Sequence, residues 1–375
     1  MKQVLIMSSV HPWNDTRIFH REAISLANAG YEVTLYAMES NRTYHHEISN
    51  LTVKTLSKTS KRKRFQTWWT FFNIARKSSA SIIHLHDPEL LPLGYILQIF
   101  HKKQVVFDMH EDFPAVLKSK KIARYPIAKP FLHLATYLEK RMLQKVSAIV
   151  FAEAYYKENY RDVSTVQVDV YNYPFLQQPV SAEKYEIPTL IYAGAIHEIR
   201  GFKEMLEVAR LLKKTGYTFQ LLIIGQVPAR LETYATNFQR KYDLEQEVTL
   251  VGRLDLSELV MYYAKSHIGL ALLHPVDNYL RSLPTKIFEY MSVSLPYILS
   301  DFEVYRELVK KTASGIVVDA QKPQEITKQI QLLLNNPERQ KYLGDNGYIH
   351  HQTMFNWSTQ ERRLIELYQS IWEEK

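Results

Sequence analysis

Two cations and a carboxylate in the second half of the chain have the chemistry of a site for a charged nucleotide. Arg200 and Lys286 each stand where a loop is predicted to lead into a helix, and Glu289 lies one turn into the second of these helices. Fixed cations and helix N-terminal N–H groups stabilise the negative charge that a departing diphosphate acquires. A carboxylate that accepts from two neighbouring hydroxyls is the usual means of holding a ribose. The three residues therefore favour a nucleoside diphosphate as the ligand.

Polar residues also follow predicted strands in the first half of the chain, where they could line a cleft. These residues are Asp15, Thr16, Arg17, His86, Asp87 and His110. Simpler roles stay open: Asp15 and Asp87 are typical of a helix cap and of a turn, and His110 could pair with a neighbouring acid. In the second half, Glu289 could be a solvated acid in a first helical turn, and Arg200 a surface cation.

Metal and cysteine chemistry are not indicated. The chain has no Cys, which excludes thiolate ligands, disulfides and a cysteine nucleophile. No Asp-x-Asp stands at a predicted strand end, and the His, Asp and Glu clusters lack the spacing of metal ligands. We therefore predict no metal site and no cofactor.

Short apolar runs alternate with helical patterns along the whole chain. Runs such as 4–7, 81–85 and 148–151 are followed, after a stretch with two prolines, by runs such as 190–193 and 220–224. This alternation predicts parallel sheets flanked by helices. We therefore predict an α/β protein with two doubly wound, Rossmann-like domains facing each other across a cleft. The predicted domains are residues 1–172 completed by a C-terminal helix at 355–375, a linker at 173–187, and a second domain at 188–354.

The chain resembles glycosyltransferase family 4, whose nucleotide-sugar-dependent members have the two-Rossmann-domain (type B) fold and retain the anomeric configuration. The resemblance rests on the segments that begin at Asp15, His86 and Asp108 and on residues 283–291, and it covers nearly the whole chain. It implies an acceptor-binding first domain, a donor-binding second domain and a final helix that crosses back onto the first domain.

The resemblance also implies roles for individual residues. Glu289 matches the second acid of the family's Glu-x7-Glu signature, which holds the ribose hydroxyls. Arg200 and Lys286 match residues that contact the donor diphosphate, and His110 matches the histidine that faces the transferred sugar; we expect these three to be catalytic. The other expected donor-binding residues are Gly194, Arg253, Leu254, Leu283, Pro284 and Thr285. The expected acceptor-binding residues are Asp15, Thr16, Arg17, His86 and Asp87.

Two positions depart from the family pattern. Arg281 stands eight residues before Glu289, where the signature has its first acid, which contacts sugar hydroxyls. Ala195 stands where the family often has an arginine, which leaves Arg200 as the basic residue expected on this loop. The identity of the transferred sugar therefore stays open.

Positive charge is concentrated in the first half of the chain. Residues 1–175 contain 24 Lys and Arg against 15 Asp and Glu, within a total net charge of +8. Two stretches, 48–86 and 113–138, contain no acid, and the first interleaves its cations with Trp and Phe. An anionic lipid surface attracts this pattern; the alternatives are a solvated face and nucleic acid, and we expect no nucleic acid partner. The residues expected to contact a membrane are Lys61, Arg62, Lys63, Arg64, Trp68 and Trp69.

Together these observations predict a bacterial, metal-independent, retaining glycosyltransferase of the hexosyltransferase type. It would transfer a sugar from a UDP-sugar or GDP-sugar to a hydroxyl of a lipid-linked saccharide during the synthesis of cell-envelope polysaccharide. No signal peptide or membrane-spanning run is predicted, so we expect a cytoplasmic protein that is peripheral to the inner face of the membrane. The alternatives are a sugar-nucleotide epimerase or phosphorylase on the same scaffold, and a non-catalytic subunit that binds sugar nucleotides or docks on a membrane.

Overall fold

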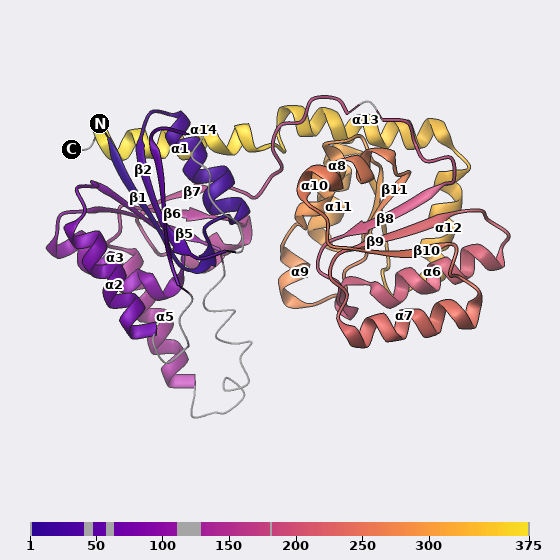
Figure 1. Cartoon of the computed structure of the whole chain (residues 1–375), viewed down its shortest axis with the longest axis horizontal. Helices are drawn as coiled ribbons and strands as arrows, with labels where there is room; N and C mark the ends of the chain where they lie inside the picture. The colour runs from indigo at the N-terminus through magenta and orange to yellow at the C-terminus, as the bar shows by residue number, and fades with distance from the viewer. Residues whose placement is uncertain (1, 41–47, 58–63, 111–128, 181, 374–375) are drawn as a thin grey trace. The chain divides into compact units, whose positions relative to one another are not determined.

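The structure, a computed structural model, describes residues 2–40, 48–57, 64–110, 129–180 and 182–373. The chain forms two units, which are coloured along the sequence in Figure 1. Met1–Asn172 and Ser358–Lys375 make up the first unit, and Tyr173–Trp357 make up the second. The predicted linker at 173–187 thus belongs to the second unit, and the chain returns to the first unit at Ser358.

The first unit contains a parallel sheet of seven strands in the order β3-β2-β1-β4-β5-β6-β7. The strands are β1 (Gln3–Pro12), β2 (Glu32–Met38), β3 (Leu51–Leu56), β4 (Ile82–Leu85), β5 (Gln104–Met109), β6 (Ala148–Phe151) and β7 (Val166–Asp169). Strands β4 and β6 are buried at every residue, as expected of a parallel sheet that is covered on both faces.

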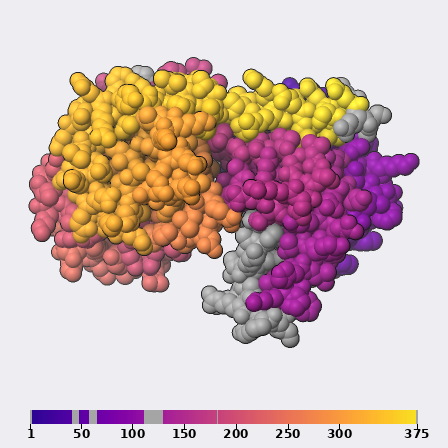
Figure 2. Space-filling view, turned by 180° about the vertical axis from the view of Figure 1, so that it is seen from behind, coloured from indigo at the N-terminus to yellow at the C-terminus, as the bar shows by residue number. Residues whose placement is uncertain are grey.

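Helices cover this sheet on both faces (Figure 1). They are η1 (Thr16–Ala23), α1 (Ile24–Asn28), α2 (Arg64–Lys77), η3 (Pro88–Leu90), α3 (Leu91–Phe100), α5 (Lys129–Leu143), η6 (Ala154–Tyr160) and α14 (Trp357–Glu373). α2, α3 and α5 pack in series, and Phe71, Leu97 and Leu143 join the core beneath them. Figure 2 shows the C-terminal part of the chain, which includes α14, in yellow. Gln360 Oε1 of α14 accepts from the N–H of Tyr171, two residues after β7, at 3.0 Å.

The first helical segment differs from the single α-helix that the sequence predicts over residues 17–29. Its first eight residues, η1, have π-type hydrogen bonding before α1 begins. Asp15 Oδ1 accepts from the N–H groups of Arg17 and Ile18 at 2.8 and 3.0 Å and so caps this segment. Because a π-type turn closes over five residues, Arg17 and Glu22 come to the same side of the helix.

The second unit contains a parallel sheet of six strands in the order β10-β9-β8-β11-β12-β13. The strands are β8 (Thr189–Ala193), β9 (Gln220–Ile224), β10 (Val248–Gly252), β11 (Ile268–Ala271), β12 (Tyr297–Ser300) and β13 (Gly315–Val318). The helices are η7 (Glu198–Arg200), α6 (Phe202–Lys214), α7 (Ala229–Tyr242), α8 (Leu256–Lys265), α9 (Asp277–Arg281), α10 (Thr285–Met291), α11 (Glu303–Thr312), α12 (Pro323–Leu334) and α13 (Pro337–Thr353). Both units therefore have the predicted doubly wound architecture.

Candidate functional site

Lys286, in the second unit, has a buried amine without a hydrogen-bond partner in the described part of the chain. The residue is 6% exposed, and its Nζ makes no hydrogen bond there. Nζ lies 3.7 Å from the ring centroid of Tyr192 and would lie 3.5 Å from a Cβ placed on Gly194. Burial, and secondly the charge of Arg200, lowers the pKa of Lys286 to about 7. An anion at this amine would supply the missing partner and favour the ammonium form.

Arg200 and Glu289 lie close enough to Lys286 to act on its charge, Arg200 disfavouring the ammonium form and Glu289 favouring it. Arg200 Nε donates to Tyr279 Oη at 3.1 Å, and the guanidinium lies 5.7 Å from the ring centroid of Tyr279. Glu289 stands one turn after Lys286 on α10, and its Oε2 accepts from Tyr263 Oη at 2.9 Å. The structure thus brings together the two predicted cations and the predicted carboxylate.

Three neighbouring strands of the second unit end in glycines that turn the chain sharply. Gly194, Gly225 and Gly252 follow or end β8, β9 and β10, and all have positive φ, at 138°, 146° and 85°. A Cβ on Gly225 would lie 2.1 Å from the carbonyl oxygen of Gly194, so that position requires glycine. A pocket of about 220 Å³ between the ends of β9 and β10 is lined by Gly225, Gly252 and Arg253, among others. This pocket adjoins Arg253 and Leu254, where we expect the base of the donor.

The segment before α10 directly precedes Lys286 in the chain. Leu283 and Pro284 are half-buried and lead directly into the helix, whose first residue, Thr285, is exposed. Arg281, which replaces the family's first acid, ends α9 and is exposed. The expected donor-binding segment therefore adjoins Lys286 along the chain.

An ion network lies inside the first unit, around Arg17. The guanidinium donates to Asp108 Oδ2 from Nη2 at 2.7 Å and from Nε at 3.1 Å. The same Nε lies 3.0 Å from Glu22 Oε1. Nη1 donates to the carbonyl of Val170 at 2.7 Å and to Asn172 Oδ1 at 3.0 Å. Arg17 therefore ties η1 to the end of β5 and to the last residues before the second unit.

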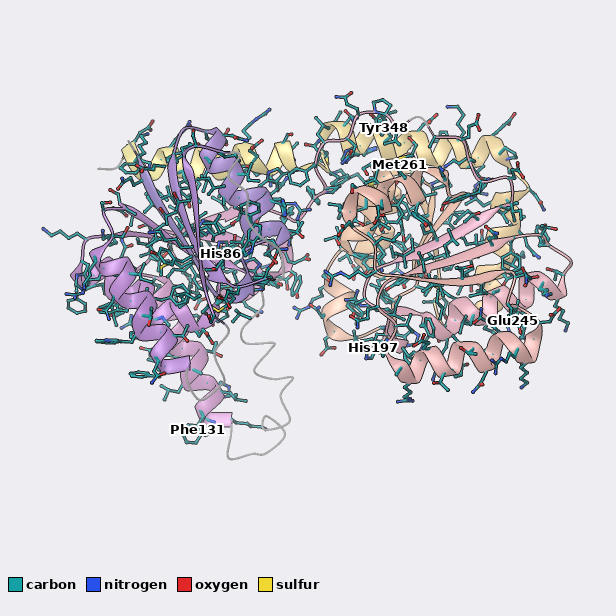
Figure 3. The ribbon with its side chains drawn as sticks, in the orientation of Figure 1. His86, Phe131, His197, Glu245, Met261 and Tyr348 are labelled. Atoms are coloured by element: carbon teal, nitrogen blue, oxygen red, sulfur yellow. The ribbon has the colours of Figure 1, made fainter. Side chains whose placement is uncertain are left out.

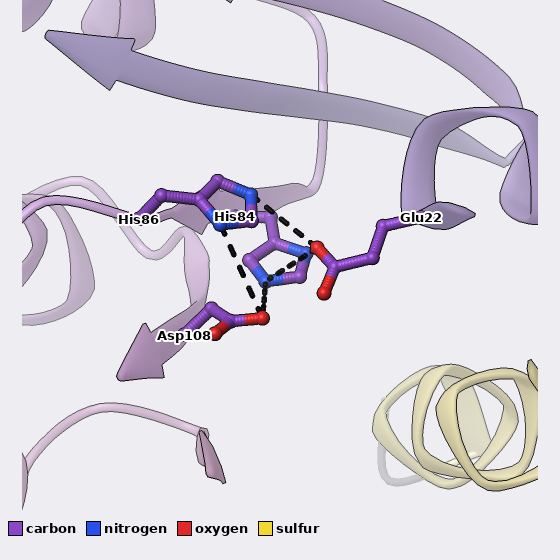
Figure 4. A group of neighbouring side chains, drawn as sticks. All are labelled: Glu22, His84, His86 and Asp108. Atoms are coloured by element: carbon purple, nitrogen blue, oxygen red, sulfur yellow. Dashed lines mark ion pairs between the residues drawn. The ribbon is translucent and has the colours of Figure 1, made fainter. Parts of the chain in front are cut away.

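Three histidines at the carboxyl ends of β4 and β5 extend this network. His84 and His86 stack with ring centroids 4.5 Å apart, and Figure 4 shows both facing the carboxylates of Glu22 and Asp108. His84 Nδ1 is hydrogen-bonded to Tyr368 Oη of α14 at 2.8 Å, and His86 Nδ1 to His110 Nε2 at 2.9 Å. The position of His86 within the unit is labelled in Figure 3.

Burial sets the protonation of this network. Burial would raise the pKa of Asp108, but Arg17 and His110 hold that pKa well below its usual range. Burial and the charge of Asp108 raise the pKa of Glu22 well above its usual value. Burial lowers the pKa of His86 well below 6.5 and that of His110 to about 4, the latter against the pull of Asp108. Asp108 is thus the carboxylate whose ionised form this network stabilises, and burial disfavours the charged forms of Glu22, His86 and His110.

Glu22, His84, His86 and Asp108 each offer one ligand atom within 4.8 Å of the others, a spacing that could hold a metal ion. The sequence does not predict this cluster, because its members come from η1, from β4 and the residue that follows it, and from β5. However, Arg17 contacts both carboxylates and already supplies the positive charge that a metal would bring, and a cation beside it would be repelled. The group fits an arginine-centred ion network better than a metal site.

Most of the side chains expected to contact an acceptor are hydrogen-bonded to other residues of the first unit. Arg17, His86 and Asp87 are buried. Asp87 Oδ2 accepts from Ser8 Oγ at 2.9 Å and from the N–H of Ser9 at 2.6 Å, so it fixes the second half of β1. These three side chains therefore have partners within the first unit, and their contact with an acceptor stays a prediction. Thr16 is exposed, and Asp15 is the helix cap described above.

The residues expected at a membrane have mixed environments. The three cations at positions 61–63 lie outside the described residues, and Arg64 is the first residue of α2. Trp69 is exposed. Trp68 is half-buried and packs against the core, so part of its side chain is accessible. In the described part of the chain no helix is both long enough and apolar enough to cross a bilayer.

Three residues of the network in the first unit, Glu22, His84 and Asp108, were not predicted as site residues from the sequence. His84 and Asp108 stand two residues before the predicted His86 and His110 at the carboxyl ends of buried strands, which is a usable signal because residues two apart in a strand share one face. Glu22 carries no comparable signal, since its place depends on the π-type turn.

Two family models match the chain, one over each unit. The model described as Glycosyltransferase Family 4 matches residues 16–171, and the model described as Glycosyl transferases group 1 matches residues 176–350. An uncharacterized glycosyltransferase of Haemophilus influenzae is 20% identical over 333 residues, which cover 88% of this chain and 89% of that protein. The amylovoran biosynthesis glycosyltransferase AmsK of Erwinia amylovora is 30% identical over 129 residues, 34% of this chain and 31% of AmsK.

Solved structures share the fold over the whole chain. Sucrose-phosphate synthase from Thermosynechococcus elongatus matches with a TM-score of 0.77 and 18% identity, covering 100% of both chains. HepE of Anabaena, solved in complex with UDP and glucose, matches with a TM-score of 0.70 and 11% identity over 99% of this chain and 100% of HepE. The chain therefore has the two-domain α/β fold of the type B glycosyltransferases.

Proposed function

We propose that this chain, which belongs to the family 4 glycosyltransferases with two Rossmann-like domains, transfers a hexosyl group from a nucleoside-diphosphate sugar to a hydroxyl with retention of configuration. The observation that carries the proposal is the buried amine of Lys286, which has no hydrogen-bond partner among the described residues and stands near Arg200. A diphosphate would pair with both cations. A buried polar group is costly until it is paired, so this site favours an anionic ligand.

The neighbouring residues support a complete donor site. Glu289 would hold the ribose hydroxyls, and the pocket beside Arg253 would take the base of a UDP-sugar or GDP-sugar. HepE, which shares the fold, binds UDP. Arg200 and Lys286 would supply the positive charge that the leaving diphosphate requires, so we propose that the reaction needs neither a metal nor a cofactor.

The proposed chemistry keeps both bonds on one face of the sugar. The bond between the anomeric carbon and the diphosphate oxygen breaks, the acceptor oxygen bonds to the anomeric carbon from the same side, and the leaving diphosphate takes the acceptor proton. We assign His110 a contact with the transferred sugar. Because burial lowers its pKa to about 4, His110 would act as a neutral hydrogen-bonding group and not as an acid.

We further propose that the acceptor is a lipid-linked saccharide used in bacterial cell-envelope polysaccharide synthesis, and that the enzyme works at the inner face of the cell membrane. The excess of Lys and Arg in residues 1–175 supports an anionic membrane surface as partner. AmsK, similar over about a third of the chain, is named for amylovoran biosynthesis.

A thermal-shift screen of UDP-, GDP-, ADP- and dTDP-sugars tests the donor, because a ligand raises stability by RT ln(1 + [L]/Kd). The anomeric configuration of the product, followed by NMR in the presence of EDTA, then tests retention and metal independence. Donor turnover without transfer would favour the epimerase, and donor binding without turnover would favour a non-catalytic subunit. No shift with any nucleotide sugar would refute the proposal.

A further inference from the structure

Exposed apolar side chains are concentrated on three helices of the first unit. α2, α3 and α5 pack in series on one face of the sheet (Figure 1). Their exposed large apolar residues are Phe65, Trp69, Ile99, Phe100, Phe131, Leu134, Tyr137 and Leu138. In the rest of this unit's described residues only Val10 and Val166 are comparably exposed. A soluble surface rarely gathers its apolar groups in this way without a partner.

α5 carries the clearest part of this surface. Phe131, Leu134 and Leu138 are 70%, 53% and 49% exposed and occur at i, i+3 and i+7, so they form one stripe along the helix. Glu139 and Leu143, on the other side of α5, are buried. Phe131, labelled in Figure 3, lies in the first turn of α5. The helix thus has one side in the core and a second, apolar side without a partner in the described residues.

The charge around the stripe selects the partner. α2 and α3 contain no acidic residue, and the one acid of α5, Glu139, is buried and accepts from Tyr160 Oη at 2.9 Å. Lys129 and Arg141 are exposed on α5 itself. A second copy of this chain would bring the same positive charge to the same face, whereas an anionic bilayer offers both apolar groups and negative charge.

We propose that the face formed by α2, α3 and α5 lies on an anionic bilayer, with the α5 stripe of Phe131, Leu134 and Leu138 inserted at the boundary between headgroups and acyl chains. The inference deepens the membrane location proposed above, on which it rests, and identifies the side chains that enter the lipid. Burial of exposed Phe and Leu side chains favours insertion, while the surrounding cations add an attraction that salt screens.

Vesicle binding by substituted proteins tests this face. The test variant is Phe131→Ser, Leu134→Ser and Leu138→Ser together. A matched control replaces three exposed apolar residues of the second unit, Leu332→Ser, Tyr342→Ser and Ile349→Ser. In flotation with phosphatidylcholine vesicles containing about a third phosphatidylglycerol, we expect the wild type and the control to bind alike and the test variant to bind at least about tenfold more weakly. Equal binding by all three proteins would overturn the proposal.

Insertion can be observed directly because the chain has no cysteine. Leu134→Cys, labelled with a fluorophore that senses polarity, should shift to the blue on anionic vesicles, and labelled Ile349→Cys should not. No blue shift at position 134 would refute lipid insertion. A change in the fluorescence of this label when the protein is diluted, at the concentration where sedimentation shows a dimer dissociating, would refute it in favour of a second copy of the chain. The donor-induced thermal shift of the test variant should equal that of the wild type, so a failed donor site would be recognised separately from a failed membrane face.

Discussion

Donor affinity should fall as the pH rises through 7, because the amine of Lys286 is poised to lose its proton in the free protein. Burial lowers its pKa to about 7, so below that pH the unliganded residue is an ammonium and above it a neutral amine. A bound diphosphate stabilises the ammonium. Binding above pH 7 must therefore take up a proton, and the affinity contributed by the charge is present at low pH and lost at high pH.

The size of the effect follows from that pKa. If the complex holds only the ammonium, the apparent Kd scales with one plus the ratio of neutral to charged Lys286 in the free protein. Between about pH 6 and about pH 8.5 this factor rises about 30-fold, equivalent to about 2 kcal/mol. An exposed lysine with an ordinary pKa would give no change over the same range.

Titration calorimetry with UDP-glucose or GDP-mannose, depending on which of them binds, measures the Kd. Repeating the titration in buffers of different ionisation enthalpy measures the number of protons taken up on binding. Lys286→Met should bind weakly and without this pH dependence. Lys184→Met is a matched control, since burial also lowers the pKa of Lys184, to about 8, but its Nζ already donates to the carbonyl of Ser266 at 2.6 Å. A Kd that stays constant from pH 6 to 8.5, or a Lys286→Met protein that binds as tightly as wild type, would refute the reasoning.

Three further substitutions, and a control for the third, probe the two units. Glu289→Ala should weaken donor binding by about 1 to 3 kcal/mol in calorimetry, the cost of leaving hydroxyls unpaired, and unchanged affinity would remove Glu289 from the site. His110→Ala should lower kcat far more than it changes donor Kd, since a contact made in the transition state affects rate; equal kcat would leave His110 as a structural histidine. Asp108→Ala should lower the free energy of unfolding by about 3 to 5 kcal/mol because it leaves Arg17 buried without its main ion pair. Asp162→Ala, which breaks an exposed pair with a lysine, should cost at most about 1 kcal/mol in the same denaturant titration.

The sequence predicts the two sheets well because most of their strands are buried on both faces and therefore read as continuous apolar runs. β3 and β7 were not predicted, since these edge strands carry polar residues such as Lys54 and Gln167 along their length. The grouping of Arg200, Lys286 and Glu289 could be predicted because the two cations stand where a loop leads into a helix and Glu289 follows one turn later; that they bind a donor stays a prediction. Tyr192 and Tyr263, which set the environment of Lys286 and Glu289, could not, because aromatic residues in buried positions look like ordinary core.

The contrast between the units also shows why net charge alone does not locate an anionic substrate. The first half of the chain holds the excess of Lys and Arg, yet the most buried of its described cations, Arg17, is already paired with Asp108. The second half is nearly neutral, yet Lys286 is buried with no hydrogen-bond partner in the described residues. A charge in low dielectric interacts far more strongly than one at a solvated surface, so one unpaired buried lysine favours a bound diphosphate more than several exposed ones do. Surface charge of the first unit is suited instead to an extended partner that meets many cations at once, such as a lipid surface.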